Sequence, residues 1–321
     1  MVMLVVATTS DAASATPAAA FLAMPGWTPG PAIPDGVESF ANGRVRLLRH
    51  ARGIVEEDDL DLRWEAATGE RVSEVVLLSR HTAVSNRPAL TVHPIGVPHL
   101  REGDVPPQGG RPGWAALPNP RIGPWLRLLR RIAGDRGLVP EFEITLEGTH
   151  HGPVTNTPTL FVEIGSTEEY WGRQDAAETV ALLLWKGLGL GEEASVGNWH
   201  GNGEKVLLGI GGGHYAPRHM DIVMKDGVWV GHLLSGYSLP MEELKQTNGK
   251  NLADVGGMWK HSIKVSYEAT KEAFPGGEKV ETEHQASSKH KLQRGVTQAA
   301  MTNLRRKRIS SSCSLGPGLM D

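Results

Sequence analysis

The stretch "LFVEIGSTEEYW", from Leu160 to Trp171, joins a short apolar run to the start of a helix pattern. The run Leu160–Ile164 is nearly continuous rather than alternating, which is typical of a strand buried on both faces. Ser166 and Glu169 then have the spacing of a capping box, so we expect a helix to begin there and to continue to Trp185. Three glycines should end that helix: Gly187, Gly189 and Gly191.

The same alternation of strand and helix patterns recurs along the chain. Further apolar runs of strand length are Leu4–Ala7, Val45–Leu48, Val75–Leu78, Phe142–Leu146, Val206–Ile210 and Val228–Leu234. Helix patterns cover the alanine-rich Ala12–Met24 and begin again at Pro124, since proline suits a first helical turn. This alternation predicts an α/β fold with a mixed, largely parallel sheet flanked by helices. We assign residues 1–280 to a single α/β catalytic domain.

Composition and charge narrow the class of protein. The chain has 321 residues, is 40% hydrophobic and has a formal net charge of −3, so it can bury a sizeable core and carries no global basic field. Any contact with nucleic acid therefore requires a local patch. The one cysteine, Cys313, excludes a disulfide framework and a cysteine zinc cluster, and fits a reducing compartment such as the cytoplasm. The apolar Met1–Thr9 is too short for a membrane span, so we expect a buried first strand and no membrane association.

Two regions have the composition of irregular structure. Residues 94–120 form a long connection rich in proline and glycine, and a loop of that length is typical of a lid or binding loop. Residues 281–321 are polar and poor in large apolar side chains, so we expect a disordered tail. Four consecutive basic residues, Arg305–Arg308, would suit nuclear import or nucleic-acid binding, although such runs are usually solvated charge.

Histidines gather near the ends of the predicted strands. Those within a dozen residues of such an end are His81, His93, His150, His151, His214 and His219, while His99 lies in the long connection. Binding sites of open α/β sheets form at the carboxyl edge of the strands, so we expect these histidines to share one site there. The alternative is a set of separate structural histidines. For His150 and His151 to share one ion the chain must turn, which Gly148 and Gly152-Pro153 indicate.

Two carboxylates complete the candidate site. Glu147 lies at the end of an alternating strand, beside the turn that carries His150 and His151. Glu163 interrupts a buried strand, and a buried carboxylate needs a cation or a hydrogen-bond donor. Imidazoles with one or two carboxylates make an open zinc site, where zinc lowers the pKa of a bound water and polarises a carbonyl. We therefore predict metal ligands among His93, His150, His151, His214 and His219, with catalytic roles for His81, Glu147 and Glu163.

The segment "GIGGGHYAPRHMD", Gly209–Asp221, follows a predicted strand but matches no phosphate-binding motif. Pro217 is poorly placed to continue a helix that starts within the glycines, so we expect no helix amino terminus to attract phosphate there. Glycines permit close approach of the backbone to a ligand, so we predict substrate contacts at Gly211, Gly212 and Gly213. A plain glycine turn is the alternative.

A local basic patch is predicted on the helix that begins at Pro124. Arg127, Arg130 and Arg131 are three or four residues apart, which places them on one side of the helix, opposite the leucines. Such a face could bind the phosphate backbone of a nucleic acid. A solvated helix face is the alternative.

Four of these segments carry a resemblance to a known family. They are "SRHTAVSNRPALTVHPIG", "LEGTHHGPVTNTPT", "FVEIGSTEEYW" and "GIGGGHYAPRHMDI", and the extended "VPPQGGRPGWAALPNPRIGPWLRLLR" adds a further likeness. In this order they resemble the D-aminoacyl-tRNA deacylases of the archaeal and plant type, and the last segment resembles the plant branch. The resemblance covers about residues 1–280. After Phe274–Glu278 the chain departs from the family pattern, so residues 281–321 form an atypical tail.

The resemblance implies an enzyme that hydrolyses the ester between a D-amino acid and the 3′ end of tRNA. It also implies two Zn²⁺ ions per subunit, a fold similar to peptidyl-tRNA hydrolases and phosphorylases, and removal of aldehyde-modified D-amino acids from tRNA. We expect a monomer in the cytoplasm, with nuclear import as a further option. The alternatives are a metal-dependent peptidyl-tRNA hydrolase, a nucleoside phosphorylase-like enzyme, and a non-catalytic tRNA-binding protein.

Overall fold

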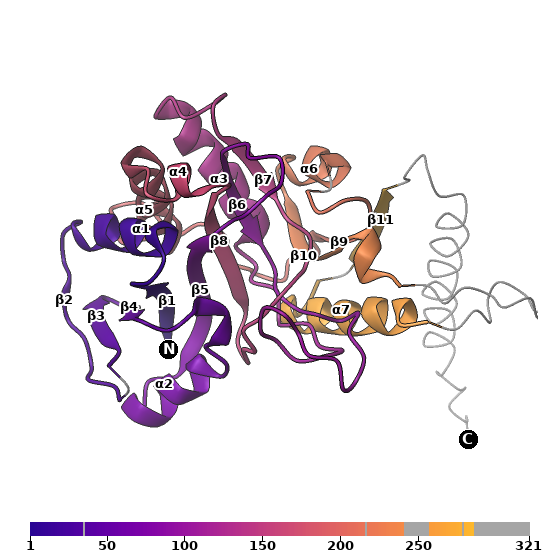
Figure 1. Ribbon diagram of the computed structural model, residues 1–321, viewed down its shortest axis with the longest axis horizontal. Helices are drawn as coiled ribbons and strands as arrows, with labels where there is room; N and C mark the ends of the chain where they lie inside the picture. Colours follow the sequence, from indigo (N-terminus) through magenta and orange to yellow (C-terminus); the bar gives the residue numbers. More distant parts are fainter. Residues whose placement is uncertain (35, 216, 241–256, 278, 286–321) are drawn as a thin grey trace, which may run out of the picture.

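The computed structural model describes the chain except for residues 35, 216, 241–256, 278 and 286–321 (Figure 1). Its first set of strands is β1 (Val2–Thr8), β2 (Thr28–Pro29), β3 (Glu38–Asn42), β4 (Val45–His50), β5 (Val72–Arg80), β6 (Ala89–His93), β7 (Glu143–Leu146) and β8 (Thr159–Gly165). Within the described residues these strands form an eight-stranded sheet, the large sheet, in the order β2-β3-β4-β1-β5-β8-β6-β7.

The strands of the large sheet do not all run the same way. β4, β1, β5 and β8 are parallel, whereas β6 is antiparallel to β8 and β7 is parallel to β6. At the other edge, β2 and β3 add antiparallel pairs. The predicted mixed, largely parallel sheet is confirmed, and every apolar run expected to be a strand belongs to one.

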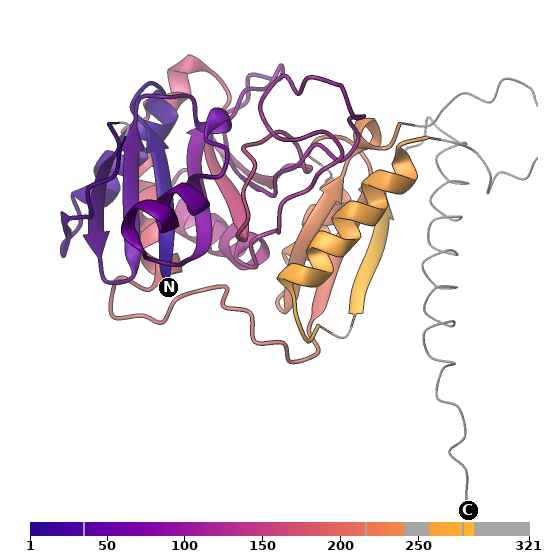
Figure 2. The same ribbon diagram turned by 90° about the horizontal axis from the view of Figure 1, so that it is seen from below.

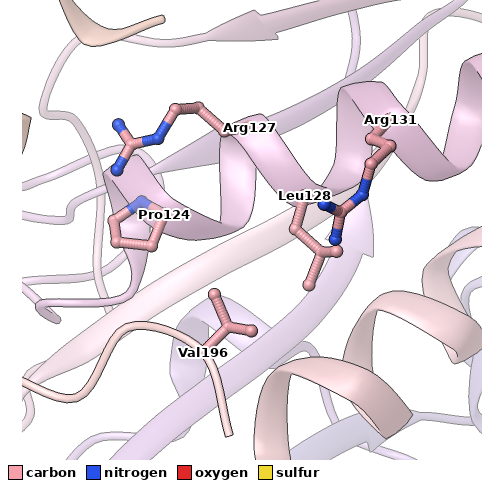
Figure 3. Close-up of a pocket in the computed structure, with 5 residues that line it drawn as sticks. All are labelled: Pro124, Arg127, Leu128, Arg131 and Val196. Carbon is pink, nitrogen blue, oxygen red and sulfur yellow. The ribbon is translucent and has the colours of Figure 1, made fainter. Parts of the chain in front are cut away.

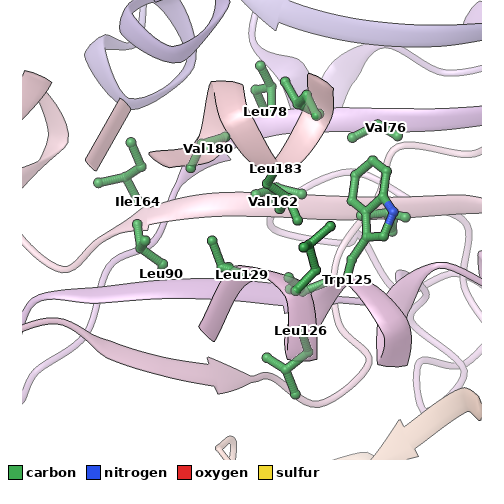
Figure 4. Packing of buried hydrophobic residues seen from close by; sticks show 14 of the residues in the cluster. Val76, Leu78, Leu90, Trp125, Leu126, Leu129, Val162, Ile164, Val180 and Leu183 are labelled. Carbon is green, nitrogen blue, oxygen red and sulfur yellow. The ribbon is translucent and has the colours of Figure 1, made fainter. Parts of the chain in front are cut away.

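The helices are α1 (Ala12–Leu22), α2 (Leu60–Thr68), α3 (Ile122–Asp135), α4 (Glu168–Trp171), α5 (Gln174–Leu188), α6 (Pro217–Val223) and α7 (Trp259–Ala273), with 3-10 turns η1 (Ile54–Glu56) and η2 (Gly236–Ser238). α5 packs between α1 and α3, and the three helices cover one face of the large sheet. Figure 4 shows the side chains of β5, β8 and β6 meeting those of α5 and α3 in this core. We call this face the helical face.

A second, smaller sheet follows in the chain. It consists of β9 (Lys205–Gly211), β10 (Val228–Leu234) and β11 (Lys279–Gln285), all parallel, with β9 in the middle. α7 lies along this sheet, as Figure 2 shows, and α3 contacts β10 as well as β6 and β7. The two sheets therefore share α3 as a common packing element.

The structure describes only part of the tail that was expected to be disordered. β11 continues to Gln285, so residues 281–285 form a strand and not the tail expected from residue 281. The remainder of that tail, with Arg305–Arg308 and Cys313, lies outside the described residues. The single domain of residues 1–280 stays a prediction.

Two local predictions were wrong. The helix expected to run from Ser166 to Trp185 is broken at Gly172 and Arg173 into α4 and α5, and the Ser166 side chain bonds the carbonyl of Arg87 at 2.5 Å instead of capping a helix. The second concerns the segment Gly209–Asp221, where no helix amino terminus was expected. α6 begins within this segment, with Pro217 at its first position. Proline needs no partner for its nitrogen at a first helical position, which is why it starts α6 instead of preventing it.

Residues 94–120 are held tightly against the fold. The Gly96 nitrogen donates to the carbonyls of His150 and His151, and the Gly152 nitrogen donates to the carbonyl of Gln108. A Cβ atom on Gly152 would lie 2.1 Å from the Gly110 nitrogen, so only glycine permits this approach. The segment thus packs directly against the backbone of the two adjacent histidines. Among the described residues, no helix is both long and apolar enough to span a membrane.

Candidate functional site

The antiparallel pairing of β6 with β8 places several polar side chains on one face of the large sheet. Glu163 of β8 pairs with Thr91 of β6, two residues before His93. Side chains alternate along a strand, and Leu90 and Val92 belong to the helical-face core, so Thr91 and His93 point to the other face. Much of that face is apolar, and we call only its part around Thr91, His93 and Glu163 the polar face. Because β5 and β8 run opposite to β6 and β7, the site forms on this face and not at the single carboxyl edge expected from the sequence.

Three histidines form the first group on this face. His93, His150 and His151 can each offer one ring nitrogen within 4.8 Å of the others'. Their Nδ1 atoms lie 3.2, 2.8 and 2.6 Å from the carbonyls of Pro94, Gly148 and Gly152. Each Nδ1 donates there as N–H, which leaves the Nε2 lone pair of each ring available. The turn predicted between His150 and His151 is confirmed, since His151 has a φ of 38°.

The electrostatics of this group keep the imidazoles neutral. Burial, followed by the charges of neighbouring histidines, holds the pKa of His150 well below its usual value. Burial likewise lowers the pKa of His93 to about 4 and that of His151 to about 3, and a neighbouring histidine acts in the same direction on each. Neutral imidazole is the form that binds a metal ion.

The second group centres on Glu147, whose side chain is fully buried. Its Oε2 lies 2.5 Å from His214 Nε2, and its Oε1 lies 3.1 Å from His81 Nδ1. Burial opposes the negative charge, but the hydrogen bonds from His214 and His81 outweigh it and hold the pKa of Glu147 well below its usual range. Burial would lower the pKa of both histidines, yet bonding to Glu147 raises the pKa of each.

Glu163 connects the two groups. One of its oxygens lies 3.6 Å from His93 Nε2 and the other lies 3.7 Å from His81 Nδ1. Burial, and then the charge of Glu147, raise the pKa of Glu163 well above its usual range. Two buried carboxylates in one cluster therefore repel each other, a situation that a cation would relieve.

The donor set fits a divalent metal ion. His93 Nε2 is buried with no hydrogen-bond partner among the described atoms, although its Nδ1 is bound to a carbonyl. A histidine held by a backbone carbonyl at one nitrogen and open at the other is the usual arrangement of a metal ligand. Three combinations of side chains could hold an ion: His93–His150–His151, His81–Glu147–His214 and His93–Glu147–Glu163.

The structure brings together most of the residues predicted from the sequence. The cluster, as we name it from here on, consists of His81, His93, Glu147, His150, His151, Glu163 and His214. His219 is different: it is buried in α6, and a Cβ atom on Gly209 would lie 2.8 Å from its ring. It belongs to none of the three combinations, so its predicted role as a ligand finds no support in this placement. Gly211 and Gly212 turn the chain after β9 with φ of 91° and 85°, while Gly213 is exposed.

The predicted arginines lie on the helical face. Arg127 Nη1 donates to the carbonyls of Val223 and Val228, at 2.7 and 3.0 Å, so this side chain ties α3 to the small sheet. Arg130 and Arg131 are exposed. Figure 3 shows Arg127 and Arg131 beside a pocket whose other lining residues are Pro124, Leu128 and Val196. Because α3 packs on the face opposite the cluster, these arginines are separated from it by the large sheet.

Four neighbours of the cluster were missed by the sequence analysis. Tyr215 bonds His81 Nε2 through its hydroxyl, and the Tyr237 hydroxyl lies 3.2 Å from His214 Nδ1. Thr149 lies 3.0 Å from His232 Nδ1, whose Nε2 donates to the Ala116 carbonyl at 2.8 Å. Tyr215 directly follows His214 in the glycine-rich segment, and this position could have indicated that it lies near the site. Tyr237 and His232 follow or interrupt apolar runs and gave none.

Comparisons with known proteins identify the family of this chain. A family model described as D-aminoacyl-tRNA deacylase matches residues 68–300. A D-aminoacyl-tRNA deacylase of Arabidopsis thaliana is 68% identical over 87% of this chain and 89% of its own length. The chain belongs to the D-aminoacyl-tRNA deacylase family. The expected archaeal and plant type is confirmed, because relatives of the same name in Aeropyrum pernix and Hyperthermus butylicus are 34% and 39% identical over 64% and 53% of the chain, and over 69% and 60% of their own lengths.

The match to this family extends further than the resemblance suggested. The family model reaches residue 300, beyond the expected limit near residue 280, so part of the atypical tail still follows the family pattern. The crystal structure of a conserved protein of unknown function has the same fold, with a TM-score of 0.71 and 24% identity over 94% of this chain and 92% of its own.

Proposed function

We propose that this chain hydrolyses the ester that joins a D-amino acid to the 3′-terminal ribose of tRNA. The observation that carries the proposal is the convergence of Glu147, Glu163 and five imidazoles on the polar face of a D-aminoacyl-tRNA deacylase fold. The Arabidopsis relative, which is named D-aminoacyl-tRNA deacylase, is 68% identical to the chain over 283 residues. Aldehyde-modified D-aminoacyl-tRNA presents the same ester, so we extend the proposal to it.

The metal we propose is zinc, in two ions per chain. The two combinations His93–His150–His151 and His81–Glu147–His214 share no residue, so each could serve one ion. Nitrogen and carboxylate ligands are those that zinc prefers in catalytic sites. When bound, the metal would polarise the ester carbonyl as a Lewis acid. We propose no oligomeric partner for this activity.

The chain's own residues supply the proton transfers. When His93–His150–His151 alone holds metal, Glu147, kept ionised by His81 and His214, accepts a proton from the attacking water as the water oxygen bonds to the ester carbon. The bond from that carbon to the ribose oxygen then breaks, and Glu147 returns the proton to the ribose oxygen. His214 is 31% exposed and has a raised pKa, so it can stabilise negative charge that develops on the carbonyl oxygen.

The contacts to the rest of the tRNA stay predictions. Arg127, Arg130 and Arg131 are proposed to bind phosphates, and Gly211, Gly212 and Gly213 to contact the acyl group. Charge reversal at Arg130 and Arg131 should weaken tRNA binding and reduce its dependence on salt if they bind phosphates. An unchanged salt dependence of binding would mean that these exposed arginines contact solvent and not tRNA. We place the reaction in the cytoplasm, and nuclear import through Arg305–Arg308 remains a separate proposal.

The decisive experiment compares D- and L-tyrosyl-tRNA as substrates. The purified chain should release D-tyrosine and leave L-tyrosyl-tRNA largely intact, and a chelator should abolish release while zinc restores it. Metal analysis of the same preparation gives an independent count of bound ions. Equal or absent release from the two substrates would refute the proposal, and release from N-blocked L-aminoacyl-tRNA would indicate a peptidyl-tRNA hydrolase. Salt-dependent tRNA binding without turnover would indicate a non-catalytic binding protein.

A further inference from the structure

The members of the cluster differ in their exposure to solvent. The side chains of His81, His93, Glu147 and Glu163 are at most 4% exposed, and His151 is buried. His150 and His214 are the members with substantial exposure, at 18% and 31%. A substrate therefore reaches the cluster past these two imidazoles.

Tyr237 lies at this opening. It is 50% exposed and is the one aromatic residue among the exposed large hydrophobic side chains of the described chain. Its hydroxyl lies 3.2 Å from His214 Nδ1, and its ring is tilted by only 28° from the His214 ring, with 6.3 Å between centroids. The edge of His99 packs against it at 5.9 Å. A half-exposed aromatic ring beside a group assigned to the chemistry offers a flat apolar surface on which a planar ligand can stack.

The backbone that carries Tyr237 is fixed. The Gly236 nitrogen donates to the Gly212 carbonyl at 2.8 Å, and the Ser238 nitrogen donates to the Ser235 carbonyl at 3.0 Å. Both serines are buried. Together with the contacts of the ring to His214 and His99, these bonds hold Tyr237 in place before any ligand arrives, so little conformational entropy is lost when a flat group stacks on it.

The proposed substrate has a flat group in the corresponding place. The ester is attached to the terminal ribose of tRNA, and the same ribose carries an adenine. When the ester carbonyl lies against the cluster, the adenine must lie one sugar away, on the open side. Single-stranded ends of RNA are commonly bound by stacking of their bases on aromatic side chains.

We propose that Tyr237, supported by the edge of His99, is the stacking subsite for the terminal adenine of aminoacyl-tRNA. This inference rests on the proposed function, whose substrate supplies the adenine. Every tRNA ends in the same nucleotide, so the subsite binds all substrates alike and leaves selection of the amino acid to other residues. It also assigns a role to two residues, Tyr237 and His99, that the chemical step does not use.

The test measures binding directly and so does not depend on turnover. The probes are a 5′-labelled CCA trinucleotide and the same oligonucleotide with an abasic 3′-terminal ribose, followed by fluorescence anisotropy. The wild-type chain should bind CCA about 5- to 150-fold more tightly than the abasic probe, which is the range expected for one stacked base. Tyr237→Phe should keep this preference because the ring remains, whereas Tyr237→Ala should lose it.

Leu62→Ala is the matched control, because Leu62 of α2 is exposed to a similar extent, 47%, and lies outside the cluster. It should keep the wild-type preference. The inference is overturned if wild-type chain shows no preference, if the preference survives in Tyr237→Ala, or if Leu62→Ala removes it as well. A preference that depends on Tyr237 in a chain that releases no D-tyrosine would defeat the proposed function and leave the nucleotide subsite standing.

Discussion

The two faces of the large sheet have opposite chemistry at β6 and β8, whereas on β1, β4 and β5 both faces are apolar. On the helical face, Leu90 and Val92 of β6 and Ile164 of β8 are buried among the side chains of α1, α3 and α5. On the polar face, His93 and Glu163 of those strands are buried among imidazoles and carboxylates. Burial of apolar side chains on the first face stabilises the fold. On the second face the buried polar and charged groups need hydrogen-bond or charge partners, because their burial is otherwise unfavourable.

This difference indicates that the residues of the helical face mainly stabilise the fold, whereas those of the cluster mainly serve the chemistry. A buried carboxylate is costly unless it is paired, and the pairs on the polar face involve histidines in place of arginines or lysines. Imidazoles can also bind metals and transfer protons. We therefore expect substitutions on the polar face to remove activity, and substitutions on the helical face to lower stability.

The largest effect is expected at Glu147. Glu147→Gln removes the charge that bonds His214 at 2.5 Å and His81 at 3.1 Å, so the kcat for D-tyrosyl-tRNA should fall by about 100- to 10,000-fold. Glu163→Gln is the matched variant, because the histidine contacts of Glu163 are longer, 3.6 and 3.7 Å. It should have the smaller effect. A larger loss in Glu163→Gln would transfer the role of base from Glu147 to Glu163.

The next effect is expected at the imidazoles of the first group. His150→Ala removes a ring whose Nδ1 is fixed by Gly148 and whose Nε2 is available, so bound zinc should decrease and kcat/KM should fall by more than about 100-fold. His200→Ala alters an exposed histidine outside the cluster and should change neither quantity. Metal analysis and the deacylation assay check this. If His150→Ala keeps its full zinc content and full activity, His150 is not a metal ligand.

The helical face should respond in the opposite way. Leu90 is fully buried, and Leu90→Ala should reduce the free energy of unfolding by about 2–5 kcal/mol while the kcat of the folded protein stays near the wild-type value. Leu90→Met keeps most of the volume and should cost less than about 1.5 kcal/mol. Urea denaturation and assays well below the unfolding transition measure both quantities. A strong loss of kcat without loss of stability would show that the two faces are not separable.

The helical face was predictable from the sequence because apolar runs report burial directly. The runs that contain Val162, Leu207 and Val230 all became strands, since their length and continuity admit few alternatives. β6 was missed because it is only five residues long and its "ALTVH" alternates apolar and polar side chains. The composition of one strand does not reveal its direction in the sheet. The antiparallel direction of β6, and therefore the position of the site on the polar face, could not be inferred from the sequence.

The polar face was predictable in its members but not in its geometry. Histidines near strand ends and a carboxylate inside an apolar run indicated the cluster, because such groups seldom lie in those places without partners. His219 fits the same pattern, yet it packs against Gly209. Arg127 has the spacing of a basic face, yet its guanidinium bonds two carbonyls of the small sheet. Local spacing cannot tell a ligand from a packing residue when the deciding partner is distant in the chain.

His232 provides a further test, because it is a buried imidazole that belongs to neither face and whose two ring nitrogens bond Thr149 and Ala116. Its ring ties β10 to the turn before His150 and to the long connection. Burial lowers its pKa to about 4, against 6.5 as its ordinary value, although the bond to Ala116 opposes this shift. It thus joins the small sheet to the polar face as a neutral hydrogen-bonding group.

The smallest effect we predict is a change in the pH dependence of stability in His232→Gln. Between pH 4 and 6.5 the unfolded chain binds a proton at His232 that the folded chain does not, so His232 makes the free energy of unfolding rise with pH by about 1.4 kcal/mol per unit. This contribution is complete above pH 6.5 and is lost as the pH falls toward 4. His232→Gln keeps a polar side chain but has no such titration, so its stability should approach that of the wild type as the pH falls. Leu62→Ala changes an exposed side chain that does not titrate, so it should show a constant difference in urea denaturation over the same range. A constant difference for His232→Gln as well would mean that His232 is protonated in the folded chain, and the hydrogen bonds assigned to its neutral ring would then be wrong.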